Sequence, residues 1–432
     1  MDDALEHEQI AKAIARHLDS LPTGSVLALQ GSWGRGKTNV LRRVFTRFEQ
    51  RAATGGPKPL WLDPWKYGTP DLITPVVLNL LAEIPDRRDL REVAESLLRA
   101  GSAVLFKVVS LVAPPPVAGV VGAAQEPITA MLDKWLSHGP DIEPDPVVKM
   151  AARFAELVDK YVGSAPGQLL ICIDDLDRCL PDHQVAMLEA IHFLTSAQAR
   201  CSFLIALDPL LVQQAAITHY RTAGFDSNKY LDKLFTLRLR LPELSTSSVE
   251  RLLASELDGD TARVLVDGLG VTVAQVADAF GEIFDLPELR NPRLIHRVCE
   301  RLRLLAGANA AEEHPDPRLA GRARLAPIVT WCAIADRWPE LRQLLQDTPP
   351  QMWESNVRLV CFAYGFSDVF GDDRPRLEIE AEILQFSNVP DRLPGKRQQP
   401  DLGEFLIHKV LAEEDFLTML ADADAAMIRF GL

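Results

Sequence analysis

The stretch Gly31-Ser32-Trp33-Gly34-Arg35-Gly36-Lys37-Thr38 decides the fold, because it fits the phosphate-loop pattern G-x-x-x-x-G-K-[ST]. The apolar residues 26–29 before it predict a short buried strand, and residues 39–50 after it predict a helix. Glycines let the backbone curl so that successive N–H groups point at a phosphate, at a helix N-terminus that already favours anions. The alternative is a glycine turn with a chance Lys-Thr pair, and the flanking strand and helix argue against it. The stretch therefore predicts a nucleotide-binding site.

Two side chains of this loop have predicted roles. Lys37 would bridge β- and γ-phosphate oxygens, and the Thr38 hydroxyl would take one position on Mg²⁺. The nearest match to a guanine-reading Asn-Lys-x-Asp motif is residues 228–231, which lacks the acid, so we expect ATP rather than GTP. The predicted nucleotide contacts within the loop are Gly31, Trp33, Gly34, Arg35, Gly36, Lys37 and Thr38.

A second apolar segment, residues 169–173, predicts a strand that ends in the carboxylates Asp174 and Asp175. Phosphoryl transfer needs a carboxylate that holds the metal at the end of a strand beside the phosphate loop, and Asp174 is placed for this role. Asp175 is the candidate general base, which would orient or deprotonate the attacking water. The alternative is that the acid pair only caps the helix that follows.

Four further residues are candidates for contact with the phosphates. Arg178 would reach the γ-phosphate, within one subunit or across a subunit contact, or it would only pair with Asp177 or Asp174 and hold the loop. Asp208 follows a predicted strand, and it would sense the γ-phosphate or only cap the next helix. Arg290 and Arg293 lie at the start of a helix farther along, where one of them would contact the phosphates as part of a lid, or both would be solvated.

Composition limits the classes of protein. The chain has 432 residues, of which 47% are apolar and 25% charged, so we expect a folded protein of two or three units. The net charge of −14 argues against non-specific nucleic-acid binding, which needs a basic footprint, although it does not exclude a local basic stripe. Six scattered cysteines without CxxC spacing predict a reducing cytoplasm.

Hydrophobic patterning suggests three domains. Strand patterns stop near residue 241, and helical patterns follow. The predicted domains are a phosphate-loop core over 1–241 with a helical insertion at about 70–165, a helical lid over 242–308, and a mostly helical C-terminal domain over 325–432.

Residues 103–124 are the most apolar part of the chain. A single membrane span needs about 20 uninterrupted apolar residues. Lys107 interrupts the segment near its start, and Pro114-Pro115-Pro116 divides its middle. We therefore expect a packed helical hairpin, with membrane association as the alternative.

Several segments resemble the KAP family of P-loop NTPases. The resemblance covers roughly residues 1–345, and it rests on GSWGRGKT (31–38), LWLDPWKYG (60–68), LLICIDDLDRC (169–179), and similar segments at 201–216, 230–244, 291–302 and 328–341. It implies an ATPase core with an extra strand between the phosphate-loop strand and the acid-bearing strand. It also implies a helical lid at about 242–306 with an arginine near Arg293 that senses the nucleotide. Many relatives carry membrane helices between the two nucleotide motifs, and bacterial relatives are often found in phage-defence or plasmid-borne settings.

Taken together, the sequence predicts an α/β P-loop NTPase of the additional-strand type, with a five-stranded, mostly parallel sheet flanked by helices, followed by a helical lid and a C-terminal helical region. The first functional hypothesis is Mg²⁺-dependent ATP hydrolysis that drives a conformational change or assembly, in a cytoplasmic homo-oligomer. The second is a nucleotide-gated switch or scaffold with little turnover that recruits a separate effector protein. A nucleic-acid motor is disfavoured because the basic clusters are short, and a small-molecule kinase would need an acceptor site that no motif identifies. Peripheral membrane association through residues 103–124 is the alternative localisation.

Overall fold

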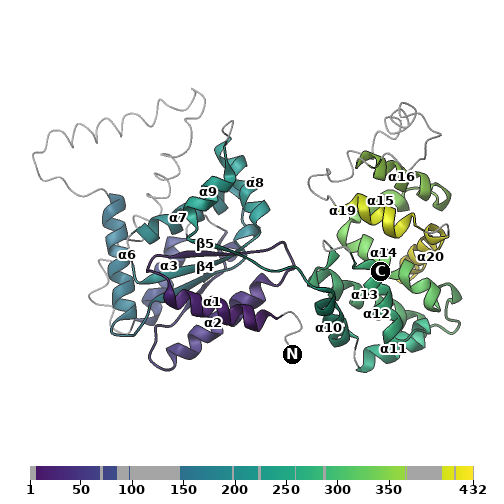
Figure 1. Cartoon of the computed structure of the whole chain (residues 1–432), viewed down its shortest axis with the longest axis horizontal. Helices are drawn as coiled ribbons and strands as arrows, with labels where there is room; N and C mark the ends of the chain where they lie inside the picture. The colour runs from purple at the N-terminus through teal and green to yellow at the C-terminus, as the bar shows by residue number, and fades with distance from the viewer. Residues whose placement is uncertain are drawn as a thin grey trace, which may run out of the picture. The chain divides into compact units, whose positions relative to one another are not determined.

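The computed structural model describes residues 6–68, 72–84, 97, 146–196, 199–221, 225–257, 259–285, 289–364, 366, 401–412 and 415–431. The chain divides into two compact units, Glu6–Leu241 and Pro242–Leu432, and each is described by itself (Figure 1). The apolar segment 103–124, which the sequence predicts to be a packed hairpin, lies outside the described residues, as does most of the predicted insertion at 70–165.

The first unit is built on a five-stranded sheet. Every pair of neighbouring strands is parallel, and the order is β2-β3-β4-β1-β5. Strand β4 therefore lies between β1, which precedes the phosphate loop, and β3, which precedes the acid pair, so the predicted additional-strand fold is confirmed. The strands are β1 (Val26–Gln30), β2 (Leu60–Leu62), β3 (Leu169–Ile173), β4 (Cys201–Leu207) and β5 (Leu237–Arg240).

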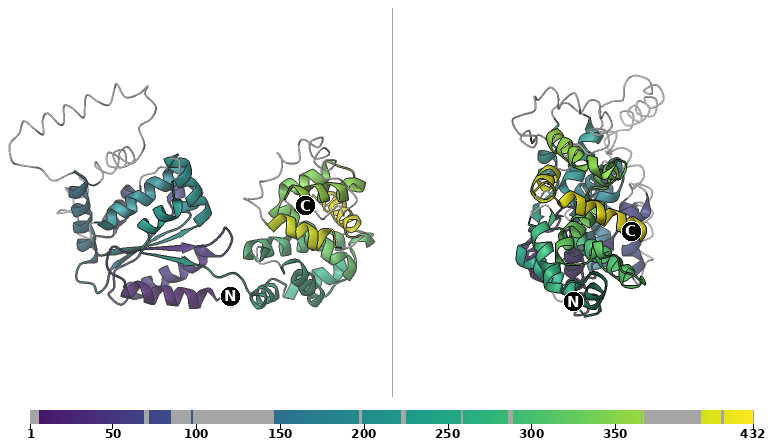
Figure 2. Two further views of the ribbon diagram at one scale, coloured as in Figure 1. Left: turned by 45° about the horizontal axis from the view of Figure 1, so that its top comes forward. Right: turned by 90° about the vertical axis from the view of Figure 1, so that its right-hand side faces the viewer.

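Helices cover both faces of this sheet. Successive side chains of a strand point to opposite faces, and in β1, β3 and β4 both faces are buried. Leu27 and Leu29 pack under α1 (His7–Ser20) and α2 (Lys37–Ala52). Val26 and Ala28 belong to the core on the other face, beneath α3 (Ile73–Glu83), α6 (Pro146–Val162) and α7 (Pro181–Ser196). Figures 1 and 2 show α1 and α2 on the side of the sheet opposite to α6 and α7.

The parallel arrangement brings the candidate site residues to one edge of the sheet. The phosphate loop follows β1, Asp174 follows β3, and Asp208 follows β4, before α8 (Pro209–Tyr220). Ligands of open α/β sheets bind at the carboxyl ends of the strands. Helix α9 (Ser227–Leu234) leads into β5, which lies at one end of the sheet.

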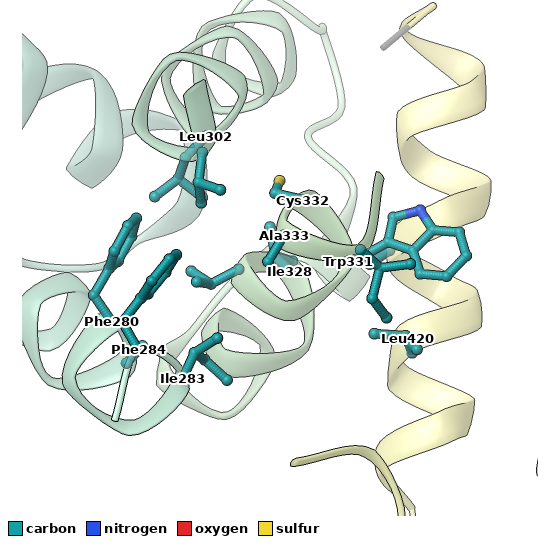
Figure 3. Close-up of a cluster of buried hydrophobic side chains, with 14 of the residues drawn as sticks. Phe280, Ile283, Phe284, Leu302, Ile328, Trp331, Cys332, Ala333 and Leu420 are labelled. Carbon is teal, nitrogen blue, oxygen red and sulfur yellow. The ribbon is translucent and has the colours of Figure 1, made fainter. Parts of the chain in front are cut away.

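In its described residues the second unit contains helices and no strand, and they share one hydrophobic core. Its central helix, α14 (Arg322–Arg337), is buried on nearly all sides along its apolar middle. Figure 3 shows Phe280 and Phe284 on one side of Ile328, and Leu420 beside Trp331 on the other. The other helices are α10 (Thr246–Glu256), α11 (Gly259–Leu269), α12 (Val273–Ile283), α13 (Pro292–Ala310), α15 (Pro339–Gln346), α16 (Trp353–Ala363), α19 (Asp401–Phe405) and α20 (Phe416–Arg429).

The predicted lid at 242–308 and the predicted C-terminal domain at 325–432 therefore belong to one unit. The reason is that α14 packs against α12 and α13 of the first segment and against α20 of the second. Among the helices of the described ranges, none is by itself long and apolar enough to cross a membrane. The consecutive helices α11 and α12 pass that test only as a pair, bent by 87°.

Candidate nucleotide site

The phosphate loop has the backbone of an anion cradle. Gly34 and Gly36 have φ values of 86° and 88°, in the left-handed region that glycine adopts most readily. A Cβ atom at Gly36 would lie 2.3 Å from the imidazole of His7, the buried first residue of α1. Helix α2 begins at Lys37, so the end of the loop forms its first turn and its N–H groups face the phosphate position. Glycine at position 36 is therefore required both by its backbone angle and by its contact with α1.

Lys37 is buried and held by groups of the site itself. Its Nζ donates to the Gly31 carbonyl oxygen at 2.8 Å and lies 3.4 Å from Asp177 Oδ2. The same oxygen of Asp177 accepts the backbone N–H of Asp208 at 2.9 Å. Asp177 therefore connects the phosphate-loop lysine to the end of β4. Sequence analysis considered Asp177 only as a partner for Arg178, and the signal for its role here was a third acid in the run that follows β3.

Thr38 and Asp174, the two predicted metal ligands, meet in the structure. Thr38 Oγ1 donates to Asp174 Oδ1 at 3.2 Å, across 136 positions of sequence. Asp174 is 3% exposed, and this burial raises its pKa to about 6, although the Thr38 hydrogen bond acts in the opposite direction. A hydroxyl and a carboxylate side by side form an oxygen donor set of the kind that Mg²⁺ prefers.

Asp175, the predicted general base, has a strained backbone. Its φ is 56°, in the left-handed region that residues with a Cβ seldom occupy, and such strain concentrates at functional sites. Burial raises the pKa of its carboxyl, against the effect of Arg178, whose Nε lies 2.9 Å from Oδ1. The Arg178 guanidinium also lies over the Trp65 ring, 5.9 Å from its centroid. Arg178 therefore pairs with the candidate base itself.

Asp63 adds a third carboxylate that sequence analysis missed. Single oxygens of Asp63, Asp174 and Asp175 lie within 4.8 Å of one another. Trp61 Nε1 donates to Asp63 at 2.9 Å, and Lys66 forms an ion pair with it. The sequence signal for this cluster was an acid directly after each of the strands β2 and β3. The pairing of the two strands, which brings the acids together, is not visible in the sequence.

The remaining loop candidates lie around this cluster. Trp33 is 52% exposed at the tip of the phosphate loop, and Arg35 Nε donates to Ser32 Oγ at 3.3 Å. Asp208 caps α8 by accepting from the backbone N–H of Leu210 at 3.0 Å, as its alternative interpretation predicts. Burial raises the pKa of the Asp208 carboxyl. The structure connects Asp208 to the nucleotide site through its backbone, because the Asp208 N–H donates to Asp177.

Of the two lid candidates, Arg290 is hydrogen-bonded within the helical unit. Its guanidinium donates to the carbonyl oxygens of Phe284 and Asp285 at 3.0 and 2.8 Å. Arg293 is the second residue of α13, and its backbone N–H is capped by Asn291. A nucleotide-sensing role for Arg293 stays a prediction.

Comparison with known proteins supports a P-loop NTPase. The model of the KAP family P-loop domain matches residues 7–308. Among solved structures, the chain is similar to the Aeropyrum pernix ORC2 protein in its ADPNP-ADP complexes, with a TM-score of 0.39, 10% identity, and coverage of 98% of this chain and 93% of that one. It is also similar to Drosophila ORC bound to DNA, with a TM-score of 0.31, 12% identity, and coverage of 98% and 86%. Neither similarity is close enough to transfer a ligand or an activity.

No curated protein matches the sequence. The family model, in contrast, spans more than half of the chain and includes every strand of the sheet and the whole carboxylate cluster. The chain belongs to the KAP family of P-loop NTPases.

Proposed function

We propose that this protein hydrolyses ATP with Mg²⁺, and that turnover drives or gates a change of conformation or assembly. The observation that carries the proposal is the contact of Thr38 with Asp174 at 3.2 Å, beside a phosphate loop and next to a strained second acid. A loop that only binds an anion has no need for a buried carboxylate at that point, because its charge would repel the anion. A metal ion between the carboxylate and the phosphates removes this repulsion.

The chain's own residues divide the work of phosphoryl transfer. The N–H groups of the loop orient the phosphates, and Lys37 offers its ammonium group to the β- and γ-phosphate oxygens. Thr38 and Asp174 would hold Mg²⁺, which would supply positive charge against the phosphate oxygens. Asp175 accepts a proton from the attacking water, and its raised pKa makes it a stronger base than an exposed aspartate. Asp63 lies beside Asp174 and Asp175 and would help to hold the metal ion.

A second candidate function, a nucleotide-gated switch with little turnover, is favoured by the pairing of charges in the site. Lys37 is engaged by Asp177, and Asp175 is engaged by Arg178. Both pairs must open before the lysine reaches a phosphate and the base reaches a water. Arg178 would release Asp175 by moving to the γ-phosphate, where a guanidinium stabilises the charge of the transition state. Slow opening of this pair would make the protein a switch.

The wider role follows from family membership and composition. We propose a cytoplasmic homo-oligomer whose helical unit recruits a separate effector protein, in a setting of phage defence. All six cysteines are free and five are buried, as suits a reducing compartment. The phage-defence setting rests on the family alone.

Steady-state hydrolysis separates the two functions. We expect the wild type to release phosphate from ATP faster than from GTP, and Lys37→Ala to abolish both binding and turnover. In Arg178→Ala the base is freed: a hydrolase that uses Arg178 in the transition state loses turnover, whereas a switch that is restrained by the pair gains it. If the wild type does not exceed Lys37→Ala with ATP, the hydrolase proposal is wrong.

A further inference from the structure

A basic groove follows the surfaces of α1 and α2 in the first unit. Two adjoining hollows, of about 580 and 290 Å³, share Arg47 and Gln50 in their linings and therefore form one groove. One carboxylate, Glu8, lines the groove. Its cationic lining residues are Lys12, Arg16, Arg42, Arg43, Arg47 and Arg51.

Half of these cations are available to a ligand. Arg43 and Arg47 share the carboxylate of Glu8, and Arg51 pairs with Asp19. Within the part of the chain that the structure describes, no acidic partner is found for the other three cations, which are all exposed: Lys12, Arg16 and Arg42. The Arg42 guanidinium lies over the Trp61 ring, 5.9 Å from its centroid. The groove is therefore strongly positive, although the chain as a whole carries a net charge of −14. A whole-chain average does not show such a local stripe.

The chemistry of the groove suits phosphodiester groups. The three cations without an acidic partner lie on both helices of the groove: Lys12 and Arg16 are one turn apart on α1, about 6 Å along its axis, and Arg42 lies on α2. The other polar side chains of the lining are Asn, Thr and Gln, the types that join arginine and lysine in binding phosphate and sugar oxygens. Cationic side chains spaced along a groove match a polymer with evenly spaced anions.

The same lining argues against an acidic protein segment. Protein interfaces are anchored by apolar or aromatic side chains that enter pockets. Among the described residues of the groove only Ala15 is apolar. Without an aromatic platform the groove also offers no stacking to bases, so recognition would be confined to the backbone.

We propose that the α1–α2 groove binds the phosphate backbone of nucleic acid without sequence preference. Such contacts release counterions, so the affinity falls steeply with salt, and non-specific dissociation constants of about 10⁻⁴–10⁻⁶ M at physiological salt are typical. The lining of the groove includes none of the three carboxylates of the nucleotide site.

The test is fluorescence anisotropy of the full chain with labelled duplex DNA, single-stranded DNA and single-stranded RNA of equal length, over a range of salt. The groove variant is Lys12→Glu/Arg16→Glu/Arg42→Glu. The control is Lys229→Glu/Lys233→Glu/Arg263→Glu, which makes the same charge change at exposed positions elsewhere. Thermal unfolding checks that both variants fold, and Lys12→Gln/Arg16→Gln/Arg42→Gln provides a milder second variant.

We expect the groove variant to bind at least tenfold more weakly at low salt, and the control to stay within about twofold of the wild type. The slope of log K against log [salt] should fall by about two to three, since three phosphate contacts are lost at about 0.7–0.9 each. Three results would overturn the proposal: no binding by the wild type at low salt, equal losses in groove variant and control, or equally strong, groove-dependent binding of poly-glutamate. The last result would assign the groove to an acidic protein.

Discussion

Replacing Asp174 by asparagine should stabilise the nucleotide-free protein while it removes the response to Mg²⁺. The wild-type carboxyl is 3% exposed, and burial raises its pKa from 3.8 to about 6. A difference of about 2 pKa units corresponds to about 3 kcal/mol of destabilisation when the group is ionised. Asparagine carries no charge, and its Oδ1 still accepts the hydrogen bond from Thr38.

The predicted gain depends on pH in a defined direction. In the unfolded chain this carboxyl ionises near pH 3.8, and in the folded protein near pH 6. Between these values the folded state binds more protons than the unfolded state, so the wild type loses stability as pH rises through this window. Above it the loss is complete. The variant has no such loss, so its advantage should be full at pH 7.5 and about half as large at pH 5, which lies near the middle of the window.

The assay is thermal unfolding without nucleotide and with EDTA, at pH 5, 6 and 7.5. For a unit of this size 1 kcal/mol shifts the midpoint by about 2–4 °C, so we expect Asp174→Asn to unfold up to about 6–12 °C higher at pH 7.5. Glu49→Gln, which removes an exposed carboxyl from α2, is the matched control and should shift little. Adding Mg²⁺ and ATP should raise the midpoint of the wild type more than that of the variant. A variant that is less stable than the wild type at pH 7.5, or an advantage independent of pH, would refute the reasoning.

Three further changes test other parts of the structure. Asp177→Asn should tighten ATP binding about three- to tenfold in calorimetry, because the buried carboxylate competes with phosphate for Lys37; weaker binding would mean that Asp177 positions the lysine instead. Gly36→Ala should abolish ATP binding and destabilise the first unit by about 1–3 kcal/mol in chemical unfolding. Adding His7→Ala should recover only part of this stability, because it removes the clash with the new Cβ atom but not the backbone strain at position 36. Trp331→Ala should lower the free energy of unfolding of the helical unit by about 3–5 kcal/mol. Because α14 packs against helices on both sides of 308–325, protease should then cleave the segments before and after it together. Cleavage of one segment alone would contradict the single core.

The strands and the metal pair could be predicted from sequence because each leaves a local signal. A buried parallel strand is a short apolar run, and the acids that follow β3 are adjacent to it. The meeting of Thr38 with Asp174 follows once both strands are known to be parallel, since their carboxyl ends share one edge.

Other features of the site depend on tertiary contacts that leave no such signal. Asp63 joins the cluster only because β2 pairs with β3, with Leu62 beside Ile173. The link from Lys37 through Asp177 to the Asp208 backbone depends on the packing of two loops. The polar segment 309–324 separates the predicted lid from the predicted C-terminal domain, but the structure buries Asn309 and Asp316 within the helical core, where Asn309 accepts the backbone N–H of Asp316 at 2.8 Å. The basic groove likewise appears only when α1 and α2 lie side by side.

Release of phosphate from ATP by Asp175→Asn, measured beside the wild type at saturating Mg²⁺ and ATP, tests the central claim most directly. The account predicts that the variant binds ATP as tightly as the wild type but turns it over at least about a hundredfold more slowly, the usual contribution of a general base. Equal turnover by the two proteins would contradict it.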